Sequence, residues 1–337
     1  MSKLLEVKNL STQFKTERGI AHAVRQVNFS LEPGETMGIV GESGSGKSVT
    51  ARSILRIIEN QGGRISSGEI LLEGDDLIKK SEKEMRAIRG NIISMIFQDP
   101  MTSLNPLIKV GEQIAEVLRY HKKYSKQQAK EETIKIMKDM SIPSAEKRYD
   151  QYPHEFSGGM LQRLMIAISL ACKPKLLIAD EPTTALDVTI QAQILRLMKQ
   201  LQDQYNMAIL LITHDLGVVA EVCDKVSVMY AGEIVESTDV ASIFEEPLHP
   251  YTWGLIESIP KLGERKGSLK PIEGQPPNLA EKIQGCAFAK RCKYRTELCD
   301  REKPALTELR PSHYVSCHHA DELVRERGNS YASAAKG

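Results

Sequence analysis

Neither sign of charge dominates this 337-residue sequence, because 45 Lys and Arg residues nearly balance 44 Asp and Glu residues. A protein that binds nucleic acid usually carries a basic excess to neutralise phosphates, so the balance argues against such a partner. Aromatic residues make up only 5% of the chain, whereas hydrophobic residues as a whole make up 41%. This composition is typical of an ordinary soluble globular protein with an aliphatic core.

Long apolar runs are also missing. No stretch approaches the roughly 18 apolar residues that a membrane-spanning helix needs. The longest candidate, Leu164 to Cys172, is bracketed by Arg163 and Lys173 and indicates a buried helix. The first ten residues, MSKLLEVKNL, mix charged with apolar residues and lack the apolar core of a signal peptide. We therefore expect a cytoplasmic chain, whose membrane role would come through a partner.

Short apolar runs alternate with helical patterns along most of the chain, and no internal repeat is visible. Strands are predicted at 4–12, 23–31, 36–40, 67–77, 92–98, 176–180, 207–213 and 225–236, and helices at 47–58, 81–89, 111–121, 126–140 and 188–204. Such alternation predicts a mainly parallel sheet with covering helices, and a helical insertion between two of its strands.

A Gly-rich loop, GESGSGKS at Gly41–Ser48, follows the strand at 36–40 and opens a helix. It matches G-x-x-x-x-G-K-S, in which glycines let backbone N–H groups point at phosphate oxygens and the helix N-terminus adds a favourable dipole. Lys47 would reach the β- and γ-phosphates, and the Ser48 hydroxyl would ligate Mg²⁺. The predicted nucleotide contacts here are Gly41, Ser43, Gly44, Ser45, Gly46, Lys47, Ser48 and Val49. A flexible Gly/Ser turn is the alternative, which the flanking strand and helix disfavour.

Two acids end the apolar run of LLIADEP at 176–182. A strand that ends in Asp180 delivers a carboxylate to the sheet edge where α/β folds bind ligands, so Asp180 is predicted to hold Mg²⁺ directly or through water. Glu181 is then placed to orient or deprotonate a water for attack on the γ-phosphate. An Asp-Glu pair alone could be a helix N-cap, but with the phosphate loop it predicts a nucleotide hydrolase.

The segment FSGGMLQR at 156–163 lies between these two elements. Ser157-Gly158-Gly159 before a helix offers a second phosphate-binding N-terminus, where small residues permit close backbone approach, although Ser-Gly-Gly alone is more often a loop. With the other two motifs, it resembles the signature sequence of ATP-binding-cassette (ABC) proteins, and the resemblance covers about residues 3–257. It implies that the signature completes the ATP site of the opposite subunit, so that the protein works as a dimer.

The resemblance implies roles for further residues. Gln98 resembles the glutamine that senses Mg²⁺ and the γ-phosphate, and His214 resembles the switch histidine that holds the catalytic carboxylate and water in line. The Ala-Leu-Asp segment that ends at Asp187 resembles the loop through which each subunit senses the ATP site of the other. Phe14 stands where the family stacks an aromatic ring on adenine, although an ordinary core Phe is the alternative. The implied catalytic residues are Lys47, Gln98, Glu181 and His214.

Met160 departs from the family pattern, because the commonest signature has Gln as its fifth residue. Methionine cannot donate a hydrogen bond, so any polar role at this position is lost. The Ser and Gly contacts remain, and we expect activity to remain with them.

The phrases EPTTALDVTIQAQIL and HPYTWGLIESIP resemble the dipeptide/oligopeptide import group, and its "D" ATPase subunit in particular. That resemblance implies a transport-coupled ATPase, a peripheral protein of the cytoplasmic membrane face, which forms a heterodimer with a second, similar ATPase. Its other implied partners are two transmembrane permease subunits, which would dock on the helical insertion, and an extracytoplasmic peptide-binding protein. Import of a related solute such as nickel or a glycoside is an alternative, as is a soluble non-transport ABC ATPase.

Four of the six cysteines crowd near the C-terminus, at Cys286, Cys292, Cys299 and Cys317. A cytosolic compartment disfavours disulfides, and the tight C-x-x-C spacing of zinc knuckles is absent. Thiolates on longer loops can hold an iron–sulfur cluster, and the resemblance to the peptide-import group implies a 4Fe-4S cluster here, with zinc or free thiols as alternatives. Such a cluster would be structural, in a module too small to bury a core. The neighbouring histidines, His313, His318 and His319, are expected at the surface, with a role as substitute ligands as the alternative.

Together these patterns predict an α/β, P-loop NTPase fold of the ABC type. It would combine a mixed sheet with a RecA-like core, an antiparallel β subdomain, a helical subdomain and a small Cys-rich C-terminal module. The predicted boundaries are 1–257 for the nucleotide-binding domain, with its helical subdomain at about 100–172, 258–280 for a linker, 281–322 for the Cys-rich metal-cluster module and 323–337 for a disordered tail.

Overall fold

The computed structural model describes residues 3–17, 19–99, 103–184, 186–259, 272–281 and 283–325. The chain forms two compact units, each built from segments that are distant in the sequence. The first unit comprises Met1–Leu5, Leu31–Thr36 and Leu72–Ile212, and the second comprises Glu6–Ser30, Met37–Leu71 and Thr213–Gly337. Most of the predicted linker and of the predicted disordered tail lies outside the described residues, and the domain boundaries stay a prediction.

A parallel sheet forms the centre of the first unit. In it, β7 (Leu176–Asp180) lies between β6 (Ile93–Ile96) and β8 (Ala208–Thr213), and Leu176 pairs with Ile93 on one side and Ala208 on the other. The residues of all these strands are buried, which explains why they are continuous apolar runs rather than alternating ones. The strand predicted at 92–98 is shorter at both ends.

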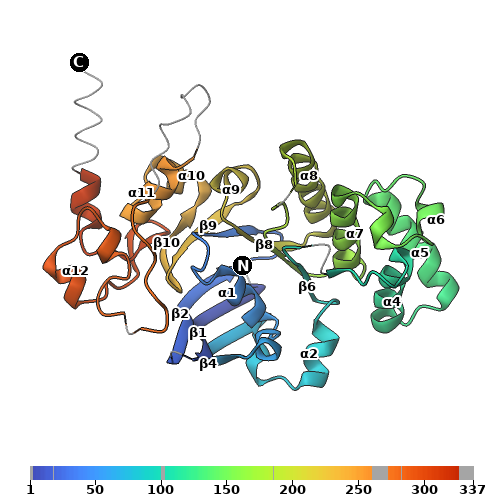
Figure 1. Ribbon diagram of the computed structural model, residues 1–337, viewed down its shortest axis with the longest axis horizontal. Coiled ribbons are helices and arrows are strands. Elements are labelled where there is room, and N and C mark those ends of the chain that lie inside the picture. Colours follow the sequence, from blue (N-terminus) through green and yellow to red (C-terminus); the bar gives the residue numbers. More distant parts are fainter. Residues whose placement is uncertain are drawn as a thin grey trace, which may run out of the picture. The chain divides into compact units, whose positions relative to one another are not determined.

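The helical insertion between β6 and β7 is present as the sequence predicts. Its helices are α4 (Val110–Lys122), α5 (Lys126–Asp139), α6 (Ala145–Arg148) and α7 (Gly158–Leu170), which Figure 1 shows grouped together in green. A capping box at Ser125 begins α5, because the Ser125 hydroxyl accepts the N–H of Gln128 and the Gln128 side chain accepts the N–H of Ser125. The other elements of this unit are β5 (Asp75–Asp76), η2 (Leu77–Lys79), α2 (Glu82–Ile88), η3 (Pro153–Glu155) and α8 (Val188–Tyr205).

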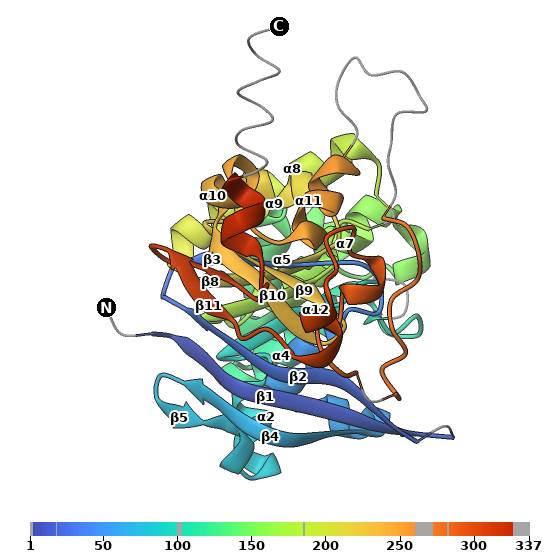
Figure 2. The same cartoon turned by 90° about the vertical axis from the view of Figure 1, so that its left-hand side faces the viewer.

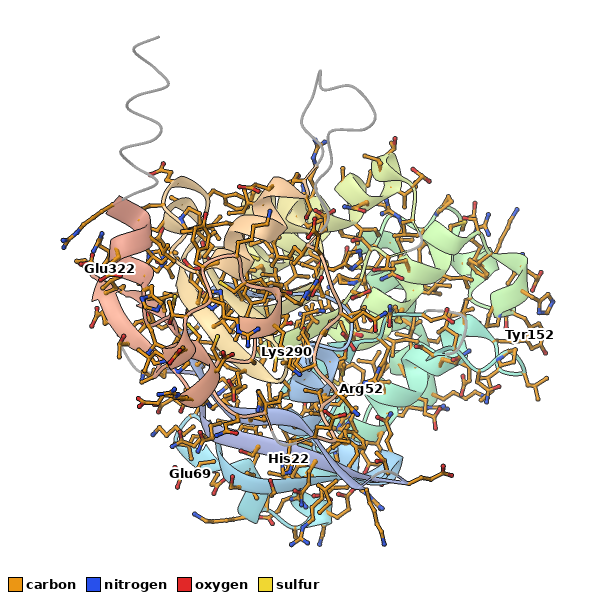
Figure 3. The ribbon with its side chains drawn as sticks, turned by 60° about the vertical axis from the view of Figure 1, so that its left-hand side comes forward. His22, Arg52, Glu69, Tyr152, Lys290 and Glu322 are labelled. Atoms are coloured by element: carbon orange, nitrogen blue, oxygen red, sulfur yellow. The ribbon has the colours of Figure 1, made fainter. Side chains whose placement is uncertain are left out.

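The second unit contains strands of two sheets. In one, β1 (Leu5–Thr16) lies between β2 (Gly19–Leu31) and β4 (Gly63–Leu72), side by side in Figure 2. His22 on β2 and Glu69 on β4 mark two of these strands in Figure 3.

The other sheet of this unit is mixed. Its strand β3 (Thr36–Val40) pairs parallel with β9 (Lys225–Tyr230), which pairs antiparallel with β10 (Glu233–Asp239). The tight turn between β9 and β10 consists of Ala231 and Gly232, both with positive φ (47° and 85°), which is the geometry that suits the twist of a hairpin. The sheet continues through β12 (His313–Val315) and β11 (Thr307–Arg310).

Short helices complete the second unit. They are α1 (Lys47–Ile54), η1 (Ile58–Gln61), α9 (Leu216–Val222), α10 (Val240–Glu245), α11 (Pro250–Glu257), η4 (Ala289–Arg291) and α12 (Glu297–Arg301). The helix predicted at 47–58 ends at Ile54, because Arg56 adopts a left-handed conformation (φ 52°) that interrupts it.

The prediction of a separate Cys-rich C-terminal module is not supported. Strand β12 extends the mixed sheet by pairing with β10, with Glu236 opposite Val315. Phe288 is buried in the same apolar cluster as Tyr230 and Tyr251, with ring centroids 5.3 and 5.4 Å from theirs. This region therefore shares the core of the second unit and does not depend on a core of its own.

Candidate nucleotide-binding and catalytic site

The phosphate loop connects β3 to α1 and requires glycine at two positions. Gly41 and Gly46 have φ values of 153° and 105°, in the left-handed region that glycine adopts without strain. A Cβ at Gly41 would lie 2.1 Å from the Met229 carbonyl oxygen, and a Cβ at Gly46 would lie 2.4 Å from that of Ala23. The backbone of β2 and β9 thus approaches the loop too closely for any side chain there.

The β9–β10 turn supports the loop from the same side. The N–H of Gly232 donates to the Ser45 carbonyl at 2.8 Å, and the Gly232 carbonyl accepts the N–H of Arg25 at 2.8 Å. The Arg25 side chain also donates from Nε to the Ala231 carbonyl at 3.1 Å. The turn and β2 therefore hold the loop in a fixed curve before any ligand arrives.

Lys47 lies inside this curve. Its side chain is buried, and its Nζ donates to the carbonyls of Gly41 at 2.7 Å and Glu42 at 2.9 Å. Ser43 and Gly44 are exposed at the opening, and a Cβ at Gly44 would meet no atom within 4 Å. The open mouth, the inward ammonium group and the N-terminus of α1 fit a phosphate group, as the motif predicts.

Two other residues predicted to act on the nucleotide belong to this unit. Phe14 is half-buried in β1, and its ring lies close to Gly63, where it would contact a Cβ. This position is compatible with an ordinary core role and with the predicted contact with adenine. Strand β1 is tied to α1 by the buried hydrogen bond between the Thr12 and Ser53 hydroxyls at 2.9 Å. His214 is exposed directly after β8.

The predicted carboxylates lie at the end of β7 in the first unit. Asp180 is fully buried as the last residue of the strand. Glu181 follows with φ 49°, an unusual conformation for a residue with a side chain, and its N–H donates to the Ile212 carbonyl at 2.8 Å.

One oxygen of Glu181 is shared by two donors. Its Oε2 accepts Nε2 of Gln98 at 2.9 Å and Oγ1 of Thr184 at 3.0 Å. Two such hydrogen bonds fix the orientation of the carboxylate. The structure thus brings the predicted residues Gln98 and Glu181 into direct contact.

The Ser-Gly-Gly segment forms the N-terminus of α7. Ser157 is its exposed N-cap residue, with no side-chain hydrogen bond to the helix. A Cβ at Gly158 would meet no atom within 4 Å, whereas one at Gly159 would lie 3.0 Å from Ile190. This helix N-terminus is accessible to an anion from outside the chain. The predicted contact residue Asp187 caps α8 by accepting the N–H of Ile190 at 2.9 Å; the preceding Ala185 lies outside the described residues.

Sequence reasoning missed two residues of this region. Thr184 was not predicted to contact Glu181. Gln162, which is buried, donates from Nε2 to the Pro182 carbonyl at 2.5 Å and so ties α7 to the turn after β7. A lone glutamine among the apolar residues of a buried helix was the available signal, because a buried amide needs a hydrogen-bond partner.

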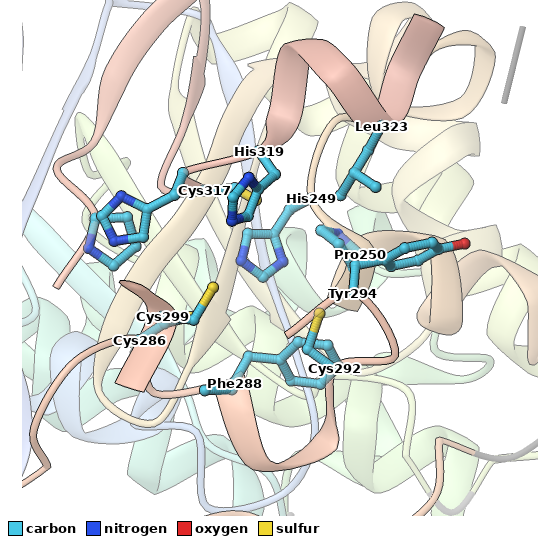
Figure 4. Close-up of a pocket in the computed structure, with 13 residues that line it drawn as sticks. His249, Pro250, Cys286, Phe288, Cys292, Tyr294, Cys299, Cys317, His319 and Leu323 are labelled. Carbon is cyan, nitrogen blue, oxygen red and sulfur yellow. The ribbon is translucent and has the colours of Figure 1, made fainter. Parts of the chain in front are cut away.

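The predicted iron–sulfur and metal-binding site is wrong. The four C-terminal cysteines line one pocket with His249, His318 and His319, and Figure 4 shows the thiols of Cys292 and Cys299 pointing into it. Among the described residues, however, no group of three or more His, Cys, Asp or Glu side chains is arranged to hold a metal ion. The zinc alternative fails on the same ground.

The four C-terminal cysteines are free thiols, and burial affects three of them. It raises the pKa of Cys286 to about 12 and that of Cys317 to about 11, and it also raises the pKa of Cys292. His313 is also not at the surface as predicted, because it is buried against Glu236.

Among the described residues, no helix combines the length and apolar character that crossing a bilayer requires.

Two protein families match the chain. The family described as "ABC transporter" matches residues 24–184, which contain the phosphate loop, Gln98, the Ser-Gly-Gly segment and both carboxylates. The family described as "Oligopeptide/dipeptide transporter, C-terminal region" matches residues 235–299.

Individual relatives match over nearly the whole length. The oligopeptide transport ATP-binding protein OppD of Bacillus subtilis is 55% identical over 94% of this chain and 88% of its own. The dipeptide transport ATP-binding protein DppD of the same organism is 51% identical over 96% of both chains. Among solved structures, the dimeric ATP-binding cassette MJ0796 bound to ADP and Pi has a TM-score of 0.61 and 27% identity, and covers 70% of this chain and 98% of that one.

The chain therefore belongs to the ABC transporter family, in the group of oligopeptide and dipeptide transport ATP-binding proteins. It is an ATP-hydrolysing subunit with the ABC-type P-loop fold, and its hydrolysis of ATP is coupled to transport.

Proposed function

We propose that this subunit drives the import of dipeptides and oligopeptides. The observation that carries the proposal is the match of its C-terminal part, residues 235–299, to the oligopeptide/dipeptide transporter family, in a chain whose relatives include OppD and DppD. Its partners would be a second, similar ATPase, two transmembrane permease subunits and an extracytoplasmic peptide-binding protein. It would act at the cytoplasmic face of the membrane.

The proposed site binds ATP together with Mg²⁺. Lys47 and the loop N–H groups bind the phosphates of ATP, and Ser48, Gln98 and Asp180 are the proposed Mg²⁺ contacts. Bound Mg²⁺ would neutralise charge on the β- and γ-phosphates. Glu181, oriented by its hydrogen bonds, positions and deprotonates the attacking water.

The proposed working form is a dimer. The exposed N-terminus of α7, with Ser157, would complete the ATP site of the partner subunit. ATP then stabilises the closed dimer, because it is contacted by both subunits, and hydrolysis removes the γ-phosphate that bridges them. His214 and Asp187 are proposed to contribute to this interface.

The first experiment replaces Glu181 by Gln in the assembled transporter. The expected result is loss of turnover by about a thousandfold or more, with ATP retained in a stable dimer. Turnover at the wild-type rate would show that Glu181 is not the general base.

The second experiment identifies the cargo. The complete transporter is reconstituted in liposomes, and uptake of radiolabelled trialanine and pentaalanine is compared with uptake of Ni²⁺ and of cellobiose. ATP-dependent uptake of the peptides supports the proposal, and uptake of only Ni²⁺ or cellobiose contradicts it.

A further inference from the structure

Glu42, the second residue of the phosphate loop, is held by two side chains from the C-terminal part of the chain. Its N–H donates to the hydroxyl of Tyr251 at 2.8 Å. Its carboxylate forms a two-pronged ion pair with Arg291, with Nη1 2.5 Å from Oε2 and Nη2 3.0 Å from Oε1. Both partners lie more than 200 residues further along the chain.

Hydrogen bonds fix the orientation of the Arg291 guanidinium group. Besides its two bonds to Glu42, it donates from Nε to the Glu273 carbonyl at 2.9 Å, from Nη2 to the Ile272 carbonyl at 3.0 Å and from Nη1 to the Tyr230 hydroxyl at 3.4 Å. An arginine has five N–H donors, and all five are used here. Only 4% of the Arg291 side chain is exposed.

Aromatic rings complete the setting of Arg291. The guanidinium carbon lies 5.8 Å from the ring centroid of Tyr230 and 6.0 Å from that of Phe288, within the range of cation–π attraction. The short element η4 that ends at Arg291 also contains Lys290, labelled in Figure 3. A lysine in place of Arg291 would keep the charge but lose the planar two-pronged geometry.

The position of Glu42 bears directly on Lys47. The Glu42 carbonyl accepts the Lys47 ammonium group at 2.9 Å and the N–H of Ser45 at 3.2 Å. The N–H, the carbonyl and the carboxylate of Glu42 are therefore each held, the first and last by the C-terminal part and the carbonyl by the phosphate loop. A change at Arg291 or Tyr251 would shift the loop backbone to which Lys47 is bonded.

We propose that Arg291 and Tyr251 act as positioning residues for ATP binding, by clamping Glu42 so that the phosphate loop keeps its ligand-ready curve. This inference rests on the proposed role of Lys47 and the loop in binding ATP. Through Arg291 and Tyr251, the C-terminal part of the chain would contribute to ATP binding. This role is independent of its cysteines and of its strands in the mixed sheet. Arg291 and Tyr251 act through Glu42 and do not contact the nucleotide themselves.

The test measures binding of the fluorescent analogue MANT-ATP, with Mg²⁺, to the full-length chain. Arg291→Lys and Tyr251→Phe are expected to raise the Kd about fivefold or more, because each loses part of the hold on Glu42. Arg295→Lys is the matched control: Arg295 makes a similar two-pronged pair with Asp300 in the same region, at 2.8 to 3.0 Å, away from the loop. Its Kd should stay within about twofold of wild type.

A double variant separates positioning from a general loss of structure. If Arg291 acts through Glu42, the Glu42→Gln and Arg291→Lys substitutions remove the same interaction. The Kd of the double variant should then be no higher than the larger of the two single-variant Kd values. Full multiplication of the two effects would overturn the clamp, as would Kd values for Arg291→Lys and Tyr251→Phe within twofold of wild type.

Lys47→Ala distinguishes failure of the clamp from failure of the proposed site. Loss of MANT-ATP binding in Lys47→Ala, with normal binding in the clamp variants, overturns the clamp alone. Normal binding in Lys47→Ala overturns the assignment of the loop itself, and the clamp with it.

Discussion

The Oε1 atom of Glu236 lies 2.7 Å from Nε2 of His313, and both side chains are buried. Glu236 also accepts the N–H groups of Leu248 at 2.6 Å and His249 at 2.9 Å, and the hydroxyl of Thr252 at 2.5 Å. One buried carboxylate thus joins β10, the start of α11 and β12. These contacts hold the segment after β10 onto the mixed sheet.

Replacing Glu236 by Ala should destabilise the protein strongly, by about 3 to 5 kcal/mol, because four buried donors lose their acceptor at once. Urea unfolding of the purified chain measures the effect. Glu246→Ala is the control, since Glu246 is half exposed and lies 3.7 Å from Arg310. Equal losses of unfolding free energy in Glu236→Ala and Glu246→Ala would show that the buried hydrogen bonds of Glu236 do not stabilise the protein.

Stability should fall as the pH falls from about 6.5 toward 4, and burial of His249 is the reason. Burial lowers the pKa of His249 to about 4 in the folded protein, from an ordinary value of 6.5. The unfolded chain therefore takes up the proton first, and the folded state loses up to about 1.4 kcal/mol per pH unit in this window. Above pH 6.5 the contribution of His249 is constant.

His249→Asn tests this assignment. The Nδ1 atom of His249 accepts the N–H of Tyr251 at 3.0 Å, and an asparagine oxygen can replace that acceptor without titrating. Urea unfolding of both proteins between pH 7.5 and 4.5 should show a weaker pH dependence for the variant. Parallel curves would mean that another group titrates in its place.

Thr184→Val should lower kcat about tenfold with little change in KM, because it removes one of the two donors that orient Glu181, worth about 1.4 kcal/mol. Thr184→Ser keeps the hydroxyl and should retain most activity. ATPase rates of the assembled transporter decide the matter. A valine variant with normal kcat would mean that Gln98 alone orients the carboxylate.

Gly46→Ala should destabilise the nucleotide-free protein more than Gly44→Ala does. Both glycines have positive φ, 105° and 76°, which costs an alanine about 1 to 2 kcal/mol at either position. Only at Gly46 would the added Cβ also collide with backbone, 2.4 Å from the Ala23 carbonyl. Urea midpoints of the two variants give the comparison, and a larger shift for Gly44→Ala would contradict the role of this close approach.

Much of the fold and of the candidate site was predictable because it depends on short, contiguous sequence patterns. The run at 176–180 predicted a buried strand that ends in Asp180, and β7 confirms it. The contact between Gln98 and Glu181 was not predicted. The family resemblance assigned both residues to the nucleotide site, but nothing in the periodicity of either segment places an amide beside that carboxylate.

The error at the cysteines has a physical cause. Four thiols near one another in sequence are compatible with a cluster, with zinc or with ordinary burial, and only their surroundings decide among these. Here Cys286 and Cys292 pack against the apolar cluster that contains Phe288 and Tyr251, and the described residues include no group of three or more ligands arranged to hold a metal ion. The cysteine spacing carried no information about that packing.

Local pattern alone predicts most of the strands, the phosphate loop and the two carboxylates of this chain, because glycine conformation, apolar runs and motif spacing act within a few residues. The pairing of Glu42 with Arg291, 249 residues apart, and the burial of His313 against Glu236 were decided only in three dimensions. Contacts between distant segments depend on how sheets and loops come together, and single side chains leave no periodic trace of such partners in a sequence.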